Sequence, residues 1–242
     1  MIERRVRIEQ EEHPDNPREG CNVGRMLCWH SRYNLGDDHD YDSDNWKREL
    51  ACEVDSSLEE KLEELEENVW NTVYECLICD GNYVGKCRNE IMEIVNHRVG
   101  ARCKALIDKA FDDGYFAMPL FLYDHSGITI SAGRFDCPWD SGCVGVIICT
   151  KQQVQEEWAG DEEKAEKWLR SEIETYDDYL TGNVWGYICE EKESGGCNGC
   201  NRPHDWEEVD SCWGFYGDPG CMKSEILDDF ADAFDSAIVE YN

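Results

Sequence analysis

Residues 144–190, VGVIICTKQQVQEEWAGDEEKAEKWLRSEIETYDDYLTGNVWGYICE, decide the fold class of this chain. The apolar run at 144–149 is typical of a buried strand, whereas residues 152–180 carry apolar side chains at three- and four-residue spacing, which predicts a helix. We expect this helix to break near Gly160. Residues 184–190 return to a strand pattern. Strands that alternate with a long amphipathic helix indicate an α+β architecture.

Further strands are predicted on both sides of this stretch, at residues 6–8, 26–29, 120–123, 128–130 and 208–215. The strand at 208–215 faces the one at 184–190 as a hairpin. We therefore predict a single α+β domain over residues 1–242, with a mainly antiparallel sheet and packed acidic amphipathic helices. The hairpin carries a Cys-rich loop at about 192–206.

A helical insertion is predicted at about 55–114. Ser57 and Glu60 have the spacing of a capping box, and apolar residues then recur at helical spacing as far as Val73. After a break at residues 80–82, a second helix is expected at about 89–111. Residues 225–238 predict one more amphipathic helix near the end of the chain, with Ile226, Phe230 and Phe234 on its buried side.

The composition is strongly acidic. Fifty-four Asp and Glu against 23 Lys and Arg give a net charge of −31, which disfavours direct contact with nucleic acid or an anionic membrane. A basic protein surface is the partner that such a charge attracts. Solubility and adaptation to salt are alternative explanations for the charge. A hydrophobic content of 41% excludes disorder over most of the chain. The polar start and the lack of a membrane-length apolar run predict a cytosolic protein.

The acids gather on the outer sides of the predicted helices. There they are expected to form the partner-binding surface, although a merely solvated face is the alternative interpretation. The residues expected to contact the partner are Glu59, Glu60, Glu63, Glu64, Glu67, Glu162, Glu163, Glu166, Asp228, Asp229 and Asp232.

The cysteines suggest structural zinc. Cys197 and Cys200 have knuckle-like spacing, and His204 could supply a third ligand. Cys189, Cys212 or a second cysteine pair would have to complete the site. A second candidate site combines a pair of cysteines with two residues further along the chain: Cys76, Cys79, Cys87 and His97. A hairpin tip and buried core cysteines are the alternative explanations. The odd total of 15 cysteines argues against a complete disulfide framework.

Polar clusters that interrupt the strands are candidates for catalysis. His125 could act as a general base for Cys137 or Ser141, and Asp124, Asp136 or Asp140 could orient it. Asp210 belongs to a further cluster of the same kind. These residues point to a hydrolase or a metal-dependent enzyme. The alternative is structural: Asp and Ser cap turns, while the neighbouring aromatic residues pack against the sheet.

The motifs YDHSG at 123–127, CPWDSG at 137–142 and DSCWGFYG at 210–217, together with RYNLGD at 32–37, resemble a family of uncharacterised proteins encoded by phages and mobile elements. The resemblance covers residues 25–44 and 118–217. It implies a biological setting and no catalytic residue. Small acidic phage proteins often disarm host enzymes that handle nucleic acid, and some imitate the phosphate lattice with carboxylates.

The leading hypothesis is therefore an inhibitor or nucleic-acid mimic whose acidic faces occupy the basic channel of a host defence protein, such as a nuclease. The first alternative is a hydrolase or metal-dependent enzyme centred on His125, Cys137 and Asp140. The second alternative is a non-catalytic adaptor that structural zinc stabilises.

Overall fold

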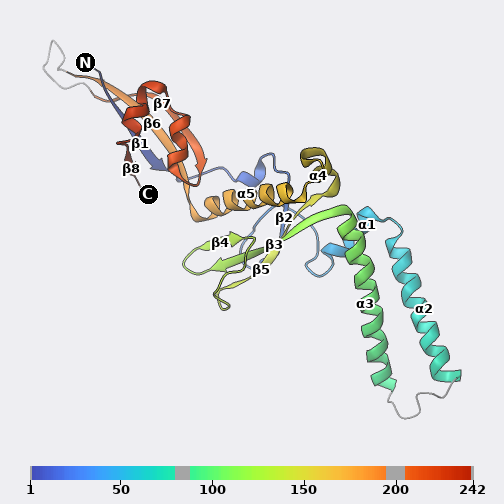
Figure 1. Cartoon of the computed structure of the whole chain (residues 1–242). Coiled ribbons are helices and arrows are strands. Elements are labelled where there is room, and N and C mark those ends of the chain that lie inside the picture. Colours follow the sequence, from blue (N-terminus) through green and yellow to red (C-terminus); the bar gives the residue numbers. More distant parts are fainter. Residues whose placement is uncertain (1, 80–87, 195–204, 241–242) are drawn as a thin grey trace. The chain divides into compact units, whose positions relative to one another are not determined.

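The computed structural model describes residues 2–79, 88–194 and 205–240. It confirms the α+β class, with two four-stranded sheets in the described residues, ordered β7-β6-β1-β8 and β2-β5-β3-β4 (Figure 1). Contacts divide the chain into two compact units. Unit 1 comprises residues 1–37, 118–147 and 166–242, and unit 2 comprises residues 38–117 and 148–165. Among the described residues, no helix is both long and apolar enough to cross a membrane.

The first sheet, in unit 1, is built on β1 (Ile2–Gln10), β6 (Val184–Glu193) and β7 (Glu207–Tyr216). β6 pairs antiparallel with both neighbours, so the predicted hairpin of β6 and β7 is confirmed. Side chains alternate across a strand, and the register sets Val6 opposite Cys189 on the buried face. The tip of the hairpin, at residues 195–204, lies outside the described residues.

The predicted helix at 225–238 is wrong. This segment contains the 3₁₀ helix η3 (Asp228–Phe230), the one-turn α6 (Ala231–Phe234) and the strand β8 (Ile238–Glu240), after a further 3₁₀ helix, η2 (Pro219–Ser224). Phe230 is buried in the core cluster of the first sheet. β8 pairs in parallel with β1, so backbone hydrogen bonds to a sheet edge take the place of the last helical turns.

The second sheet contains β2 (Arg25–Cys28), β3 (Tyr115–Asp124), β4 (Ile128–Ser131) and β5 (Ser141–Thr150). The helix α5 (Glu162–Thr181) buries residues at positions 165, 169, 173 and 176, the three- and four-residue spacing of one helix face. Gly24 lies close to Leu169 of α5 and Ile147 of β5, because no Cβ separates them. The short 3₁₀ helix η1 (Pro17–Glu19) precedes this contact.

The helix predicted at 152–180 breaks where expected. α4 (Lys151–Trp158) starts with a capping box between Thr150 and Gln153, and it ends where Ala159 and Gly160 both have positive φ (52° and 83°). α5 begins at Glu162. The conformational freedom of Gly160 thus divides an otherwise continuous amphipathic pattern.

Unit 2 holds α1 (Trp46–Val54), α2 (Leu58–Cys79) and α3 (Arg88–Gly114). α2 and α3 are the two helices predicted for the insertion, and they pack against each other. α1, whose Leu50 and Ala51 are buried, was not predicted from the sequence. Ser57 donates its N–H and its hydroxyl to Asp55 Oδ1 (3.0 and 2.7 Å), so Asp55 organises the start of α2 in place of the predicted Ser57–Glu60 capping box.

Candidate functional site

Three of the four catalytic candidates come together in unit 1. The turn after β3 carries His125, and the loop before β5 carries Cys137 and Asp140. The Nδ1 atom of His125 lies 3.5 Å from Asp140 Oδ2, and the Cys137 thiol donates to the same oxygen at 3.6 Å. The Asp124 N–H donates to the Asp140 carbonyl at 2.8 Å, which holds the two loops together.

The order of contacts in this cluster differs from that of a nucleophile, base and orienting acid. Asp140 touches both His125 and Cys137, whereas no hydrogen bond between imidazole and thiol occurs in the described part of the chain. A general base has to reach the nucleophile whose proton it takes. The Ser141 hydroxyl donates to the Cys137 carbonyl at 2.5 Å, so that hydroxyl is engaged in holding the loop.

A pocket of about 270 Å³ lies beside this cluster, between β2, the end of β3 and the start of β5. Arg32 forms an ion pair with Asp124, and the Tyr33 hydroxyl donates to the other oxygen of Asp124 at 3.3 Å. His30 Nδ1 accepts the N–H groups of Arg32 and Tyr33, both at 3.3 Å. Trp139, at the rim of the pocket, is 90% exposed.

Three residues of this pocket were not predicted as site residues from the sequence: His30, Arg32 and Trp139. Arg32 and Trp139 occur in the motifs of the phage-protein resemblance, and that was the only signal in the sequence that pointed to them. Their convergence depends on the pairing of strands far apart in the chain, which no local pattern encodes.

Asp210, the fourth catalytic candidate, lies on β7 of the first sheet, whereas the other three belong to loops of the second sheet. Its Oδ2 accepts a hydrogen bond from the Tyr187 hydroxyl at 3.2 Å. Burial and the charge of Asp210 raise the pKa of Tyr187 to about 12. Tyr187 is also a member of the buried core cluster, so this pair anchors the hairpin strand over the core.

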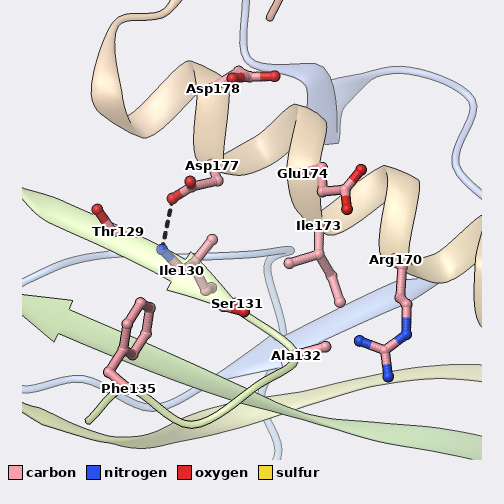
Figure 2. A pocket seen from close by; sticks show the side chains of 10 residues that line it. All are labelled: Thr129, Ile130, Ser131, Ala132, Phe135, Arg170, Ile173, Glu174, Asp177 and Asp178. Atoms are coloured by element: carbon pink, nitrogen blue, oxygen red, sulfur yellow. Dashed lines mark hydrogen bonds between the residues drawn. The ribbon is translucent and has the colours of Figure 1, made fainter.

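A second pocket, of about 340 Å³, lies between β4 and α5. Figure 2 shows Asp177 pointing at the strand, where its Oδ1 accepts the N–H of Ile130 at 2.7 Å, while Asp178 points away. Burial raises the pKa of Asp177 although this hydrogen bond opposes the shift. β4 is an edge strand, so Asp177 satisfies a backbone donor that would otherwise be free to pair with another chain.

A buried ion cluster joins α5 to the N-terminal segment of unit 1. The Arg18 guanidinium contacts both oxygens of Asp37 (2.8 Å each), Glu172 Oε2 (3.1 Å) and the Gly24 carbonyl (2.5 Å). Glu172 Oε1 also accepts the Val23 N–H at 2.8 Å. Burial lowers the pKa of Arg18, but the hydrogen bonds and charges of the two carboxylates outweigh this and raise it. The Arg18 side chain is 3% exposed, so the cluster is structural.

The predicted partner-binding acids lie in both units. Four of them have ion-pair partners: Glu59 with Arg48, Glu162 with Lys151, Glu166 with Arg170 and Asp229 with Arg4. Within the described residues, no ion pair neutralises the other seven: Glu60, Glu63, Glu64, Glu67, Glu163, Asp228 and Asp232. Asp228 and Asp232 lie on η3 and α6, not on the single long helix that was predicted.

The predicted zinc ligands Cys197, Cys200 and His204 lie outside the described residues, so structural zinc stays a prediction. In the second candidate set, His97 is exposed on α3, and Cys87 lies outside the described residues. Where the structure is described, no group of three or more His, Cys, Asp or Glu could hold a metal ion. Measurement of zinc in purified protein would test the prediction directly.

No family model, curated protein or solved structure matches this chain.

Proposed function

We propose that this chain is a non-catalytic inhibitor that binds the nucleic-acid channel of a basic protein, with α2 as its main contact surface. The observation that carries the proposal is a row of uncompensated glutamates on α2. Five glutamates between residues 60 and 67 are exposed and have no ion pair in the described part of the chain: Glu60, Glu63, Glu64, Glu66 and Glu67.

The density of these charges is close to that of nucleic acid. Residues 60–67 span seven helical rises, about 10 Å, so five carboxylates give one charge per about 2 Å of axis. Duplex DNA carries one charge per about 1.7 Å, and one of its strands carries one per about 3.4 Å. A groove lined with Lys and Arg that binds a phosphate backbone therefore offers this helix a comparable set of contacts.

Two cations beside or within this row, Arg48 and Lys61, already have partners. Arg48 pairs with Glu59, and Lys61 pairs with Asp55 before the helix begins. Like charges one turn apart destabilise a helix, so other contacts have to hold α2 in place. Leu58 and Leu62, which are 1% and 2% exposed, supply them by packing the helix into unit 2. The helix can thus keep its glutamates free of neutralising partners.

The remaining predicted acids support the proposal less strongly. Glu162, Glu166 and Asp229 each form an ion pair within the chain, so contact with a partner would have to compete with an existing cation. The resemblance to phage and mobile-element proteins favours a host nuclease, or another host protein that handles nucleic acid, as the target.

The test removes charge from α2 without changing its shape. A variant with E60Q, E63Q, E64Q and E67Q is compared with a control variant that loses four exposed acids elsewhere in unit 2, through D112N, D113N, E156Q and E157Q. Each protein is immobilised and mixed with host lysate at low and at moderate salt. At about 0.2–1 kcal/mol for each exposed ion pair, the α2 variant loses about 1–4 kcal/mol of binding, or about 5- to 700-fold.

The identity of the captured protein, and its displacement by DNA, then test whether this chain competes with nucleic acid. If the proposal holds, a nucleic-acid-binding protein is recovered with wild type and the control variant, and duplex DNA displaces it. Retention by the α2 variant at wild-type level, or a failure of DNA to compete, would refute the proposal.

One observation favours a second function, that of a hydrolase: His125 and Cys137 both contact the same carboxylate oxygen, Oδ2 of Asp140. Catalysis would need the imidazole to turn from Asp140 to the thiol when substrate binds. Alkylation of Cys137 by a substrate-like electrophile, fast in wild type and slow in H125A, would support it. Equal rates in both proteins would count against it.

A further inference from the structure

Trp139 is the most exposed large hydrophobic residue of the described chain. It is 90% exposed, although a buried indole would be worth several kcal/mol in a folded core. A single exposed apolar side chain is normal on a protein surface and needs no explanation by itself. Trp139 differs because it lines a pocket that also contains Arg32, Asp124 and Asp140, next to apolar residues of the strands. Its free aromatic face is therefore available to a group that enters the pocket.

Two carboxylates line the pocket. Both oxygens of Asp124 have partners within the chain, whereas only one oxygen of Asp140 does. Asp124 is taken by Arg32 and by the Tyr33 hydroxyl. Asp140 contacts His125 and Cys137 only through Oδ2, and in the described residues Oδ1 has no hydrogen-bond partner. This free acceptor, Oδ1 of Asp140, belongs to the residue that follows Trp139 in the sequence.

The charge of the pocket suits a cation. Arg32 is neutralised by Asp124. His30 Nδ1 accepts two backbone N–H groups and is therefore already engaged within its own loop. Asp140 is then the uncompensated charge of the lining, in a chain whose net charge of −31 attracts cations over longer distances.

We infer that this pocket binds the guanidinium group of an arginine side chain on the partner, stacked on the Trp139 indole and hydrogen-bonded to Asp140. A planar guanidinium stacks on an aromatic face and forms directed bonds to a carboxylate, and an ammonium group does this less well. The volume of about 270 Å³ lies below the usual range of small-molecule sites, and it suits one side chain.

The source of the arginine rests on the proposed function, whereas the binding chemistry does not. The basic partner proposed above would present arginines to any acidic pocket on this chain. Because α2 belongs to unit 2 and the pocket to unit 1, the two surfaces can be tested separately.

The experiment is a titration followed by NMR of the indole N–H groups. The W139F variant identifies the Trp139 signal as the one that disappears. Titration with N-acetylargininamide should shift this signal in wild type. N-acetylcitrullinamide is a neutral analogue of nearly the same shape. Its affinity should be lower by a factor of about 5 or more, because it cannot form a charge-assisted hydrogen bond. D140N should weaken arginine binding by a similar factor.

Four outcomes would overturn the inference. They are no shift with the arginine probe, equal binding of the citrulline probe, equal binding of N-acetyl-lysinamide, and undiminished binding by D140N. Free L-arginine that binds more tightly than the capped form would point to a metabolite in place of a partner side chain, and it would overturn the proposed source.

The α2 variant separates the two proposals. With E60Q, E63Q, E64Q and E67Q in place, the arginine titration should be unchanged even though capture of the partner is lost. A titration that fails in wild type while α2-dependent capture persists would sink the pocket and leave the proposed function standing. The reverse result would sink the proposed function alone.

Discussion

Replacement of Arg18 by methionine should destabilise unit 1 severely. The change keeps an unbranched side chain of similar length but removes the charge between Asp37 and Glu172, whose oxygens lie 2.8–3.1 Å from the guanidinium. The Arg18, Glu172 and Asp37 side chains are 3%, 9% and 20% exposed, so water can replace little of the lost partner. Removal of one partner from a buried ion pair costs about 3–5 kcal/mol, and we expect a cost in this range.

The matched control is on the same helix as Glu172. Arg170 forms an exposed pair with Glu166 at 2.7 Å, one turn apart, so R170M should cost only about 0.3–0.5 kcal/mol. Urea denaturation followed by tryptophan fluorescence gives both free energies of unfolding. E172Q added to R18M should recover part of the loss, because it removes one uncompensated charge. If R18M costs no more than R170M, the argument that the buried cluster is structural is wrong.

Three further predictions concern packing, pH and thiol reactivity. A Cβ added to Gly186 would lie 2.2 Å from the Trp213 ring, so G186A should cost about 1–3 kcal/mol in urea denaturation, whereas G142A, which meets nothing within 4 Å, should be close to neutral. Burial, and then the charge of Asp37, raises the pKa of Cys28 from 9.0 to about 12. The folded state therefore keeps a proton that the unfolded state loses, and its contribution to stability falls as pH rises from about 9 to about 12, which a C28S variant should abolish. Iodoacetamide at pH 8 should modify exposed Cys21 in the native protein and leave Cys28 intact, as mass spectrometry would show.

Local periodicity predicted the helices whose buried face is continuous. In α5, Leu169, Ile173 and Tyr176 recur at helical spacing and are all buried. Apart from β8, the strands of both sheets were also predicted, although several extend a few residues beyond the predicted bounds, because turn residues bound their apolar runs. α1 was missed although Trp46, Leu50 and Ala51 have helical spacing, since an acidic stretch precedes them and only about two turns follow.

The failure at the end of the chain has a tertiary cause. Ile226, Phe230 and Phe234 are four residues apart, which fits a helix, but Phe230 also fits a 3₁₀ turn over the core of the first sheet. Aspartates at 228, 229, 232 and 235 are weak helix formers. β1 meanwhile offers a sheet edge, and Ile238 pairs with Arg7 there. Helical spacing alone could not reveal this competing partner.

The sequence named the right residue types for the polar cluster but not their contacts. His125 and Asp140 are adjacent as expected, whereas the role of Arg32 depends on Asp124, 92 residues away in the chain. Arg18 depends in the same way on Glu172, which lies 154 residues further on. A single sequence contains no signal for such pairs, because either partner alone resembles an ordinary surface charge.

The surplus of negative charge is unevenly distributed over the chain, because many of the cations form ion pairs on particular helices and strands. On β1, Arg4 and Arg5 pair with Glu191 and Glu190 of β6, so these charges cancel across the sheet. Each ion pair cancels one positive and one negative charge. The net charge of −31 is therefore carried by carboxylates outside these pairs. Solubility requires only that acids be present on the surface, and it gives no reason to place five within eight residues of a helix that they destabilise. The cationic partner proposed above would supply that reason, because its binding would relieve the repulsion along α2 and so add to the affinity.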